Sequence, residues 1–193
     1  MAHAGLILDN PVSGERFEFR RTAADTNGEL LEFDLTLAGD GHVPGAHVHP
    51  EQEERFVVHK GTVKFRLGAK KIVAKAGDVV IVPAGKVHAF KNVGGEEAKV
   101  RVQVTPALDM EQLFEATVAL AEEGCTNRKG MPKPVHLALF VRRFRREVRA
   151  PFPPAPIVAA LLAPLAAIGT RRGHAARYGV PASADAPQVA VTA

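Results

Sequence analysis

Hydrophobic and polar residues alternate along most of residues 16–105, and this alternation predicts β-strands with one buried face. One run is split by Lys60 and Gly61, which predicts a turn between two strands. Glycine, proline and asparagine separate the runs about every 8 to 12 residues, as in a β-sandwich or a small barrel. The alternating runs are RFEFRR, ELLEFDLTL, RFVVHKGTVKFRLG, KIVAKAGDVVIVPAG and KVRVQVTP.

The periodicity changes after Pro106, where apolar residues recur at helical spacing. Asp109 and Gly124 are suited to begin and end a first helix. A proline-rich connector, APFPPAP, then precedes an apolar stretch over residues 156–168, which Pro164 kinks or divides. The three predicted helices have the sequences LDMEQLFEATVALAEEG, VHLALFVRRFRREVR and IVAALLAPLAAIG.

These changes divide the chain into three parts. Residues 1–107 form a β-rich domain, and residues 108–179 form a helical extension. The small, proline-containing and aperiodic residues 180–193 are expected to be disordered.

The apolar stretch over residues 156–168 is too short to cross a membrane, which takes roughly 20 residues. We therefore expect a buried helix or a dimer contact. An alternative is that it lies on an anionic membrane surface, because a basic segment precedes it. Arginines on the outer face of a packed helix explain that segment more simply; they are Arg142, Arg143, Arg145, Arg146 and Arg149.

Charge is unevenly distributed over the 193 residues, whose net charge is +4. Residues 1–107 carry 14 basic and 14 acidic residues, whereas the remainder carries 11 and 7. A neutral β-rich part argues against nucleic acid as its ligand. The single cysteine, Cys125, excludes an internal disulfide and fits a reducing, cytoplasmic compartment. The N-terminal residues have no basic start and no sustained apolar run, so we expect no signal peptide.

The segment GAHVHPEQEER, residues 45–55, carries candidate metal ligands. His47 and His49 point the same way if the segment is extended, and a hairpin brings Glu54 beside them. Glu53 is the alternative carboxylate. Two imidazoles and one carboxylate on neighbouring strands suit a divalent transition metal.

The best candidate for a fourth ligand is His88, within GDVVIVPAGKVHAFKN. His88 and Phe90 share a face of the predicted strand. Turns at Gly77, Pro83 and Gly85 would bring this strand across to the other ligands.

These two segments resemble the two motifs of the cupin family. The first, G-x5-HxH-x3,4-E-x6-G, is matched by Gly41, His47, His49, Glu54 and Gly61. The second, G-x5-PxG-x2-H-x3-N, is matched by Gly77, Pro83, Gly85, His88 and Asn92. Fifteen residues separate the motifs, as in compact microbial members. The resemblance covers about residues 28–107 and does not extend to the helices.

The resemblance implies a small jelly-roll-like β-barrel followed here by α-helices, with a metal bound by His47, His49, Glu54 and His88. Iron or manganese is favoured, and nickel, cobalt, copper and zinc are compatible. The spacing to Gly61 favours Glu54 over Glu53. His59 stands where cupins commonly have leucine, and alternation turns it away from Glu54. His42, His136 and His174 fit no ligand pattern. Cys125 lies in a predicted loop beside Arg128 and Lys129, where we expect an inert thiol, with a reactive thiol as the alternative.

Cupin membership leaves the reaction open. One hypothesis is a metal-dependent enzyme, either dioxygenase-like or an isomerase or cyclase. Its substrate would be apolar or aromatic, because no arginine cluster in the β-rich part suits a phosphate. The alternatives are a non-catalytic binding or sensor protein and a structural or storage protein. The residues predicted to line the substrate pocket are Phe56, Phe65, Val82 and Phe90. Cupin barrels commonly pair, so we also expect a homodimer.

Overall fold

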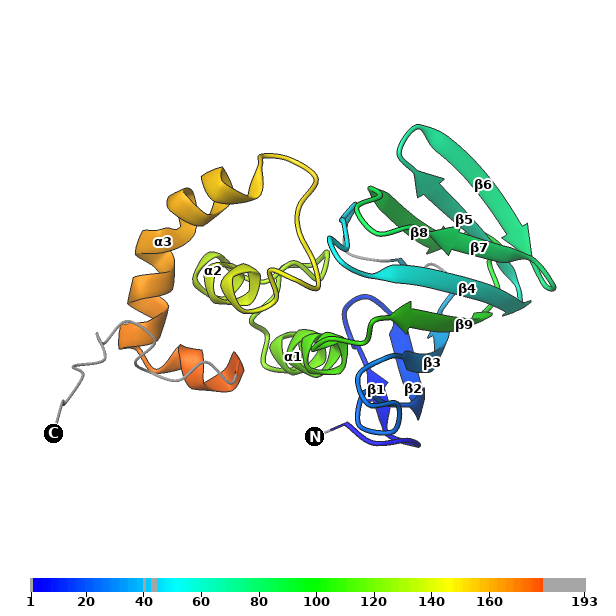
Figure 1. Cartoon of the computed structure of the whole chain (residues 1–193), viewed down its shortest axis with the longest axis horizontal. Coiled ribbons are helices and arrows are strands. Elements are labelled where there is room, and N and C mark those ends of the chain that lie inside the picture. The colour runs from blue at the N-terminus through cyan, green and yellow to red at the C-terminus, as the bar shows by residue number, and fades with distance from the viewer. Residues whose placement is uncertain (1, 40, 43–44, 179–193) are drawn as a thin grey trace, which may run out of the picture.

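The fold consists of two antiparallel β-sheets followed by helices (Figure 1). The computed structural model describes residues 2–39, 41–42 and 45–178, so the segment expected to be disordered, 180–193, lies outside the described residues. One sheet has the strand order β1-β2-β3-β9-β4-β7, and the other has the order β6-β5-β8. The strands are β1 (Ile7–Asp9), β2 (Glu15–Arg21), β3 (Leu31–Leu37), β4 (Glu53–Lys60), β5 (Thr62–Leu67), β6 (Lys70–Lys75), β7 (Val79–Val82), β8 (His88–Asn92) and β9 (Ala98–Thr105).

This architecture confirms the prediction of a mainly β, cupin-type fold followed by α-helices. Within the described residues, hydrogen bonds between strands form two separate sheets and not one closed cylinder. The turn predicted at Gly61 joins β4 to β5, and its φ of 82° requires glycine. A Cβ atom at this position would also lie 2.8 Å from the Cα of Ala98.

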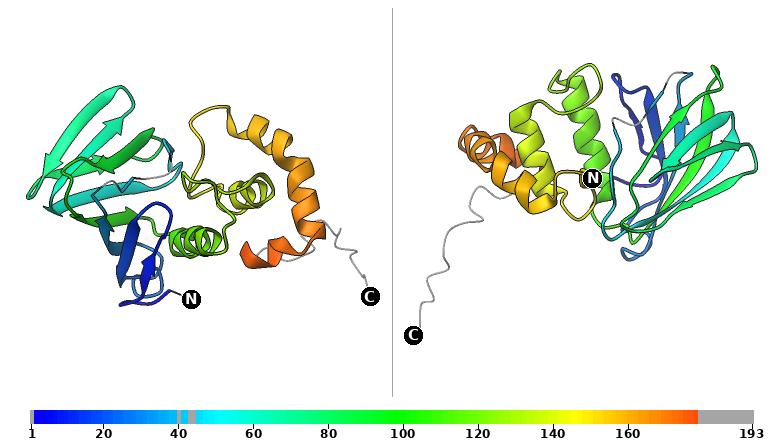
Figure 2. Two further views of the ribbon diagram at one scale, coloured as in Figure 1. Left: turned by 180° about the vertical axis from the view of Figure 1, so that it is seen from behind. Right: turned by 90° about the horizontal axis from the view of Figure 1, so that it is seen from above.

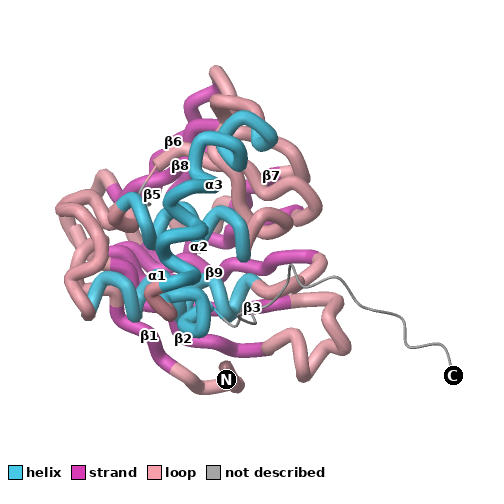
Figure 3. The backbone as a smooth tube through the Cα atoms, turned by 90° about the vertical axis from the view of Figure 1, so that its left-hand side faces the viewer, coloured by secondary structure: helices cyan, strands magenta, loops and turns pink. Residues whose placement is uncertain are grey.

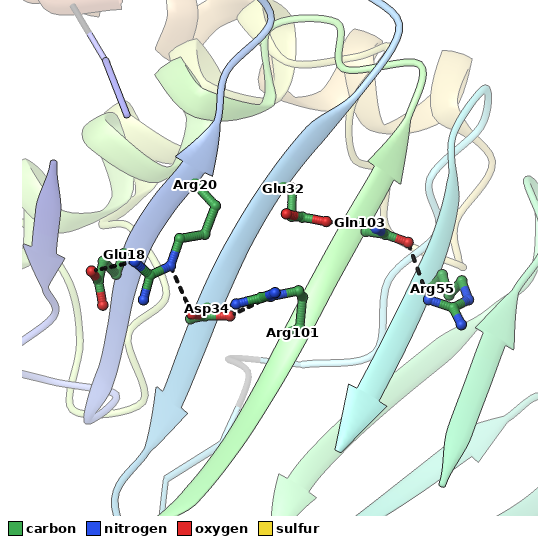
Figure 4. Close-up of polar contacts among 7 residues, drawn as sticks. All are labelled: Glu18, Arg20, Glu32, Asp34, Arg55, Arg101 and Gln103. Atoms are coloured by element: carbon green, nitrogen blue, oxygen red, sulfur yellow. Dashed lines mark hydrogen bonds and ion pairs between the residues drawn. The ribbon is translucent and has the colours of Figure 1, made fainter. Parts of the chain in front are cut away.

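Alternation along the strands separates an apolar inner face from a polar outer face. On β3, Leu31, Phe33, Leu35 and Leu37 are buried, whereas the residues that alternate with them are only partly buried. On the outer face, Asp34 accepts hydrogen bonds from Arg20 Nε (2.7 Å) and Arg101 Nε (2.8 Å) (Figure 4). The outer face of the larger sheet is therefore polar, and the apolar face must be covered by the smaller sheet and the helices.

The first helix, α1 (Met110–Glu122), covers part of this inner face. Its Phe114 ring stacks on Phe17 at 4.6 Å between centroids and meets Phe33 edge-on at 5.0 Å. Figures 1 and 2 show α1 beside the sheets, and Figure 3, seen from the helix side, shows the helices in front of the strands. The extension thus completes the core of the β-rich part.

The second and third helices, α2 (Pro134–Arg143) and α3 (Ala155–Arg171), pack against each other. Their approach is close at Gly169, where a Cβ atom would lie 2.8 Å from Leu139 Cδ1. The interpretation of the apolar stretch as a buried helix is wrong for the single chain, since Leu161 is 68% exposed. The dimer contact remains a prediction.

Helix α2 ends at Arg143, six residues earlier than the apolar periodicity suggested. Two arginines of the basic run make ion pairs, one between α2 and α1 within the extension and one between the extension and the β-rich part. Arg143 Nη1 bonds to Asp109 at the start of α1 (2.8 Å), and Arg146 Nη2 bonds to Glu51 (2.7 Å). A search of the described residues finds no helix that is long and apolar enough to span a membrane.

Candidate metal centre

The backbone of residues 47–49 is extended and is held between two other segments. His47 and His88 exchange two N–H to O=C hydrogen bonds, each 2.9 Å long. The Gly85 N–H donates to the His49 carbonyl at 2.8 Å. This pairing places His47 and His49 next to His88 at the start of β8, as the predicted turns suggested.

The four predicted ligands lie together. One ligand atom from each of His47, His49, Glu54 and His88 falls within 4.8 Å of the others. Glu54 Oε2 lies 2.9 Å from His88 Nε2 and 3.3 Å from His49 Nε2. Glu54 is buried, whereas the alternative carboxylate Glu53 is exposed and lies outside the cluster.

The second nitrogen of each histidine ring is within hydrogen-bond distance of a backbone carbonyl. A proton on Nδ1 can be donated to that carbonyl, which leaves the Nε2 lone pair free to bind a metal. The backbone thereby selects the ligand tautomer. The three pairs are His47 with Gly45 (3.0 Å), His49 with Glu147 (2.5 Å) and His88 with Lys86 (3.1 Å).

The electrostatics of the cluster also suit a cation. Burial lowers the pKa of His47 to about 3, so this imidazole is neutral at physiological pH. Burial would raise the pKa of Glu54, but His49 and His88 hold it well below its usual range. Burial would lower the pKa of His49, but Glu54 and the Glu147 carbonyl raise it above its usual range. A divalent metal would bind the Glu54 carboxylate and the neutral His47 directly and would displace a proton from His49.

Three buried atoms test whether a metal fits this cluster. His49 Nε2, Glu54 Oε2 and His88 Nε2 have no well-aligned hydrogen-bond partner among the described residues. A buried polar atom without a partner costs about 1–3 kcal/mol. One divalent cation at their centre would satisfy all three, and a set of three nitrogens and one oxygen suits a transition metal.

A cavity of about 240 Å³ lies beside the cluster and includes His47, His49 and Glu54 in its lining. Of the four residues predicted to line the pocket, Phe56 and Phe90 do so. The lining is otherwise mainly apolar and includes Leu113, Phe114, Thr117, Phe140 and Val141 from α1 and α2.

Phe65 and Val82 are not among the lining residues, which corrects the prediction for these two. They are 0% and 1% exposed and belong to the core. The Phe65 ring packs on Phe56 (5.1 Å) and Phe90 (5.5 Å), so those two rings lie between it and the cavity.

A short segment of the extension, residues 147–149, closes the site, and we call it the closing strap. Val48 and Arg149 exchange two backbone hydrogen bonds of 2.9 Å. The Glu147 carbonyl accepts the bond from His49 Nδ1, and its carboxylate accepts the Asp109 N–H at 3.3 Å. The strap thus holds a predicted metal ligand from 98 residues away in the chain.

We expect Arg149→Pro to lower the affinity for a divalent metal by roughly 10-fold. Proline removes the N–H that bonds to Val48 and loosens the strap that orients His49, and loss of such support typically costs 10- to 100-fold. The control is Arg149→Ala, which keeps the N–H and should bind metal nearly as wild type. Calorimetric titration with Mn²⁺ measures both, and equal affinities in the two variants would contradict a role for the strap.

Comparison with known proteins finds a family model that matches the β-rich part of the chain. Residues 33–105 match the family model of the cupin domain. A protein called polyketide synthase CurC, from Streptomyces cyaneus, is 29% identical over 72 residues, which cover 37% of this chain and 47% of that protein. This chain therefore matches about half the length of that relative. Residues 33–105 of this chain therefore correspond to a cupin domain.

Solved structures with a similar fold include two bacterial proteins. KdgF from Halomonas sp. has a TM-score of 0.48 at 14% identity, covering 54% of this chain and 89% of that chain. A predicted oxalate decarboxylase from Thermotoga maritima has a TM-score of 0.46 at 19% identity, covering 55% and 98%.

Proposed function

We propose that the protein is a metal-dependent enzyme that acts on a small apolar or aromatic molecule, as a dioxygenase-like enzyme or as an isomerase or cyclase. One observation carries the proposal: the cluster of ligand atoms borders a largely apolar cavity. A redox-active or Lewis-acidic metal held by His47, His49, Glu54 and His88 would supply the reactive centre.

The side chains around the cavity favour this substrate class. Phe56, Phe90 and Phe114 offer ring surfaces against which an aromatic molecule can pack. Arg149 is the one lysine or arginine among the described lining residues, so a phosphorylated substrate has little to bind it. Helices α1 and α2 contribute apolar side chains to the cavity lining.

The name of the Streptomyces relative supports the same substrate class. It is called a polyketide synthase, a name that fits extended and largely apolar molecules bearing oxygen atoms.

The test is reconstitution followed by a substrate screen. Metal-free protein is loaded separately with Fe²⁺, Mn²⁺, Ni²⁺, Co²⁺, Cu²⁺ and Zn²⁺ and incubated with phenols and polycyclic ketones. Oxygen uptake with a product that gains two oxygen atoms supports a dioxygenase, and a product of unchanged mass supports an isomerase. His49→Ala is expected to be inactive. Tight binding of these compounds without turnover under any metal would instead favour a non-catalytic binding or sensor cupin.

A further inference from the structure

A carboxyl group, that of Glu15, lies in the cavity without belonging to the metal cluster. Glu15 begins β2 and shares its inner face with Phe17, and both residues line the cavity. The residue is only 6% exposed. Burying a carboxyl group costs free energy that an apolar side chain in the same place would not, so its presence requires an explanation.

The turn that precedes β2 positions this carboxyl group. Asn10 Oδ1 accepts hydrogen bonds from the N–H groups of Val12 (3.0 Å) and Ser13 (3.1 Å). The Ser13 hydroxyl then donates to Glu15 Oε2 at 2.6 Å. No other hydrogen bond to this carboxyl group forms within the described ranges, so Oε1 has none of its own.

Strand register places Glu15 far from the metal cluster. Glu54 on β4 pairs with Val104 on β9, and Val104 in turn pairs with Leu31 on β3. Glu15 on β2 pairs with Leu37, which lies six residues beyond Leu31 on β3. At about 3.3 Å per residue, this separates the two carboxyl groups by about 20 Å along the strands. Within the cavity lining, Glu15 therefore lies well away from the metal cluster.

The surroundings of Glu15 allow its carboxyl group to donate as well as to accept a hydrogen bond. Burial raises the pKa of Glu15 to about 7, and the bond from Ser13 offsets part of that rise. The other ionisable groups of the lining are those of the metal cluster and Arg149. Near neutral pH, a neutral carboxyl group can donate to a carbonyl, and the ionised form can accept from a hydroxyl.

We propose that Glu15 forms a second polar subsite, which hydrogen-bonds to a carbonyl or hydroxyl oxygen at the far end of an extended apolar substrate. This inference rests on the proposed function, because it takes the same cavity as the substrate site. It narrows the substrate class to elongated molecules that carry an oxygen at the end remote from the metal centre.

Two probes of the same shape test the subsite. 2-Hydroxyanthracene carries an oxygen at one end of a three-ring molecule, and anthracene lacks it; fluorescence titration measures the affinity for each. Wild-type protein is expected to bind the hydroxylated probe about fivefold more tightly, which one hydrogen bond supplies. Glu15→Met should abolish this preference without weakening anthracene binding, and Glu15→Gln, which keeps both a donor and an acceptor, should retain most of it.

The outcomes separate this inference from the proposed function. If wild type shows no preference, if Glu15→Met retains it, or if neither probe binds, the subsite is refuted. Metal content is measured in the same preparations and should be unchanged in both Glu15 variants, since Glu15 is outside the ligand cluster. His88→Ala should lose metal and keep the preference, whereas wild type that binds no metal would refute the proposed function alone.

Discussion

His88→Ala is expected to lower the affinity for a divalent metal by roughly 100-fold. Complete protein ligand sets provide about 10–16 kcal/mol, so the loss of one ligand in four should cost about 3 kcal/mol. His88 is fully buried, and its Nε2 lies 2.9 Å from Glu54 Oε2, so no solvent-exposed group can readily replace it. Elemental analysis of protein purified without chelator measures the occupancy, and titration with Mn²⁺ measures the affinity.

The matched control is His59→Ala. His59 lies on β4, as Glu54 does, but its side chain is exposed. We expect this variant to retain full metal content, so the comparison separates loss of a ligand from loss of a histidine. Circular dichroism shows whether each variant is folded. The prediction is contradicted if folded His88→Ala retains its metal. It is also contradicted if His59→Ala loses as much metal as His88→Ala.

Local pattern is sufficient to predict most of the strands, though not β1 (Ile7–Asp9), and the grouping of these ligands. Alternation determines which side chains share a face, and the glycine and proline residues determine where the chain turns back. His47 and His49, two residues apart, must therefore point together once the segment is extended. The contact with His88 required turns between the two segments, and those turns carry their own residue types.

The alternation of apolar and polar residues does not show how deeply an inner-face side chain is buried. Phe56 and Phe65 both occupy inner faces, but one lines the cavity and the other is covered by neighbouring rings. Which of them meets the cavity depends on how the smaller sheet and α1 pack over the larger sheet. That packing is tertiary, and the strand pattern is the same in either case.

The closing strap could not be predicted because its contacts are with the backbone. The carbonyl of Glu147 holds His49, and any residue has a carbonyl, so the sequence contains no marker for the contact. The run of arginines was visible, but only the structure shows that Arg143 joins α2 to α1 and that Arg146 joins the extension to Glu51. Glu15 is different, because it lies two residues before Phe17 and its sequence position could have placed it on the apolar face, but the predicted run began at Arg16 and left it out.

Glu15→Gln is expected to change the pH dependence of stability. The pKa of Glu15 rises from 4.5 to about 7 on folding, so the folded chain holds this proton more tightly than the unfolded chain. Its contribution to stability is therefore fully present below about pH 4.5 and is lost as pH rises through about 7. Glutamine does not titrate, so the Glu15→Gln variant does not lose this contribution to stability as pH rises.

Between about pH 5 and about pH 8, the unfolding free energy of Glu15→Gln should therefore rise by about 2–3 kcal/mol relative to wild type. Urea unfolding at the two pH values measures this difference. The control is Glu18→Gln on the same strand, where Glu18 pairs with Arg20 at the surface (2.9 Å) and a surface pair contributes little. Parallel pH profiles for wild type and Glu15→Gln would show that the carboxyl group is solvated in solution, and that the cavity admits water as far as β2.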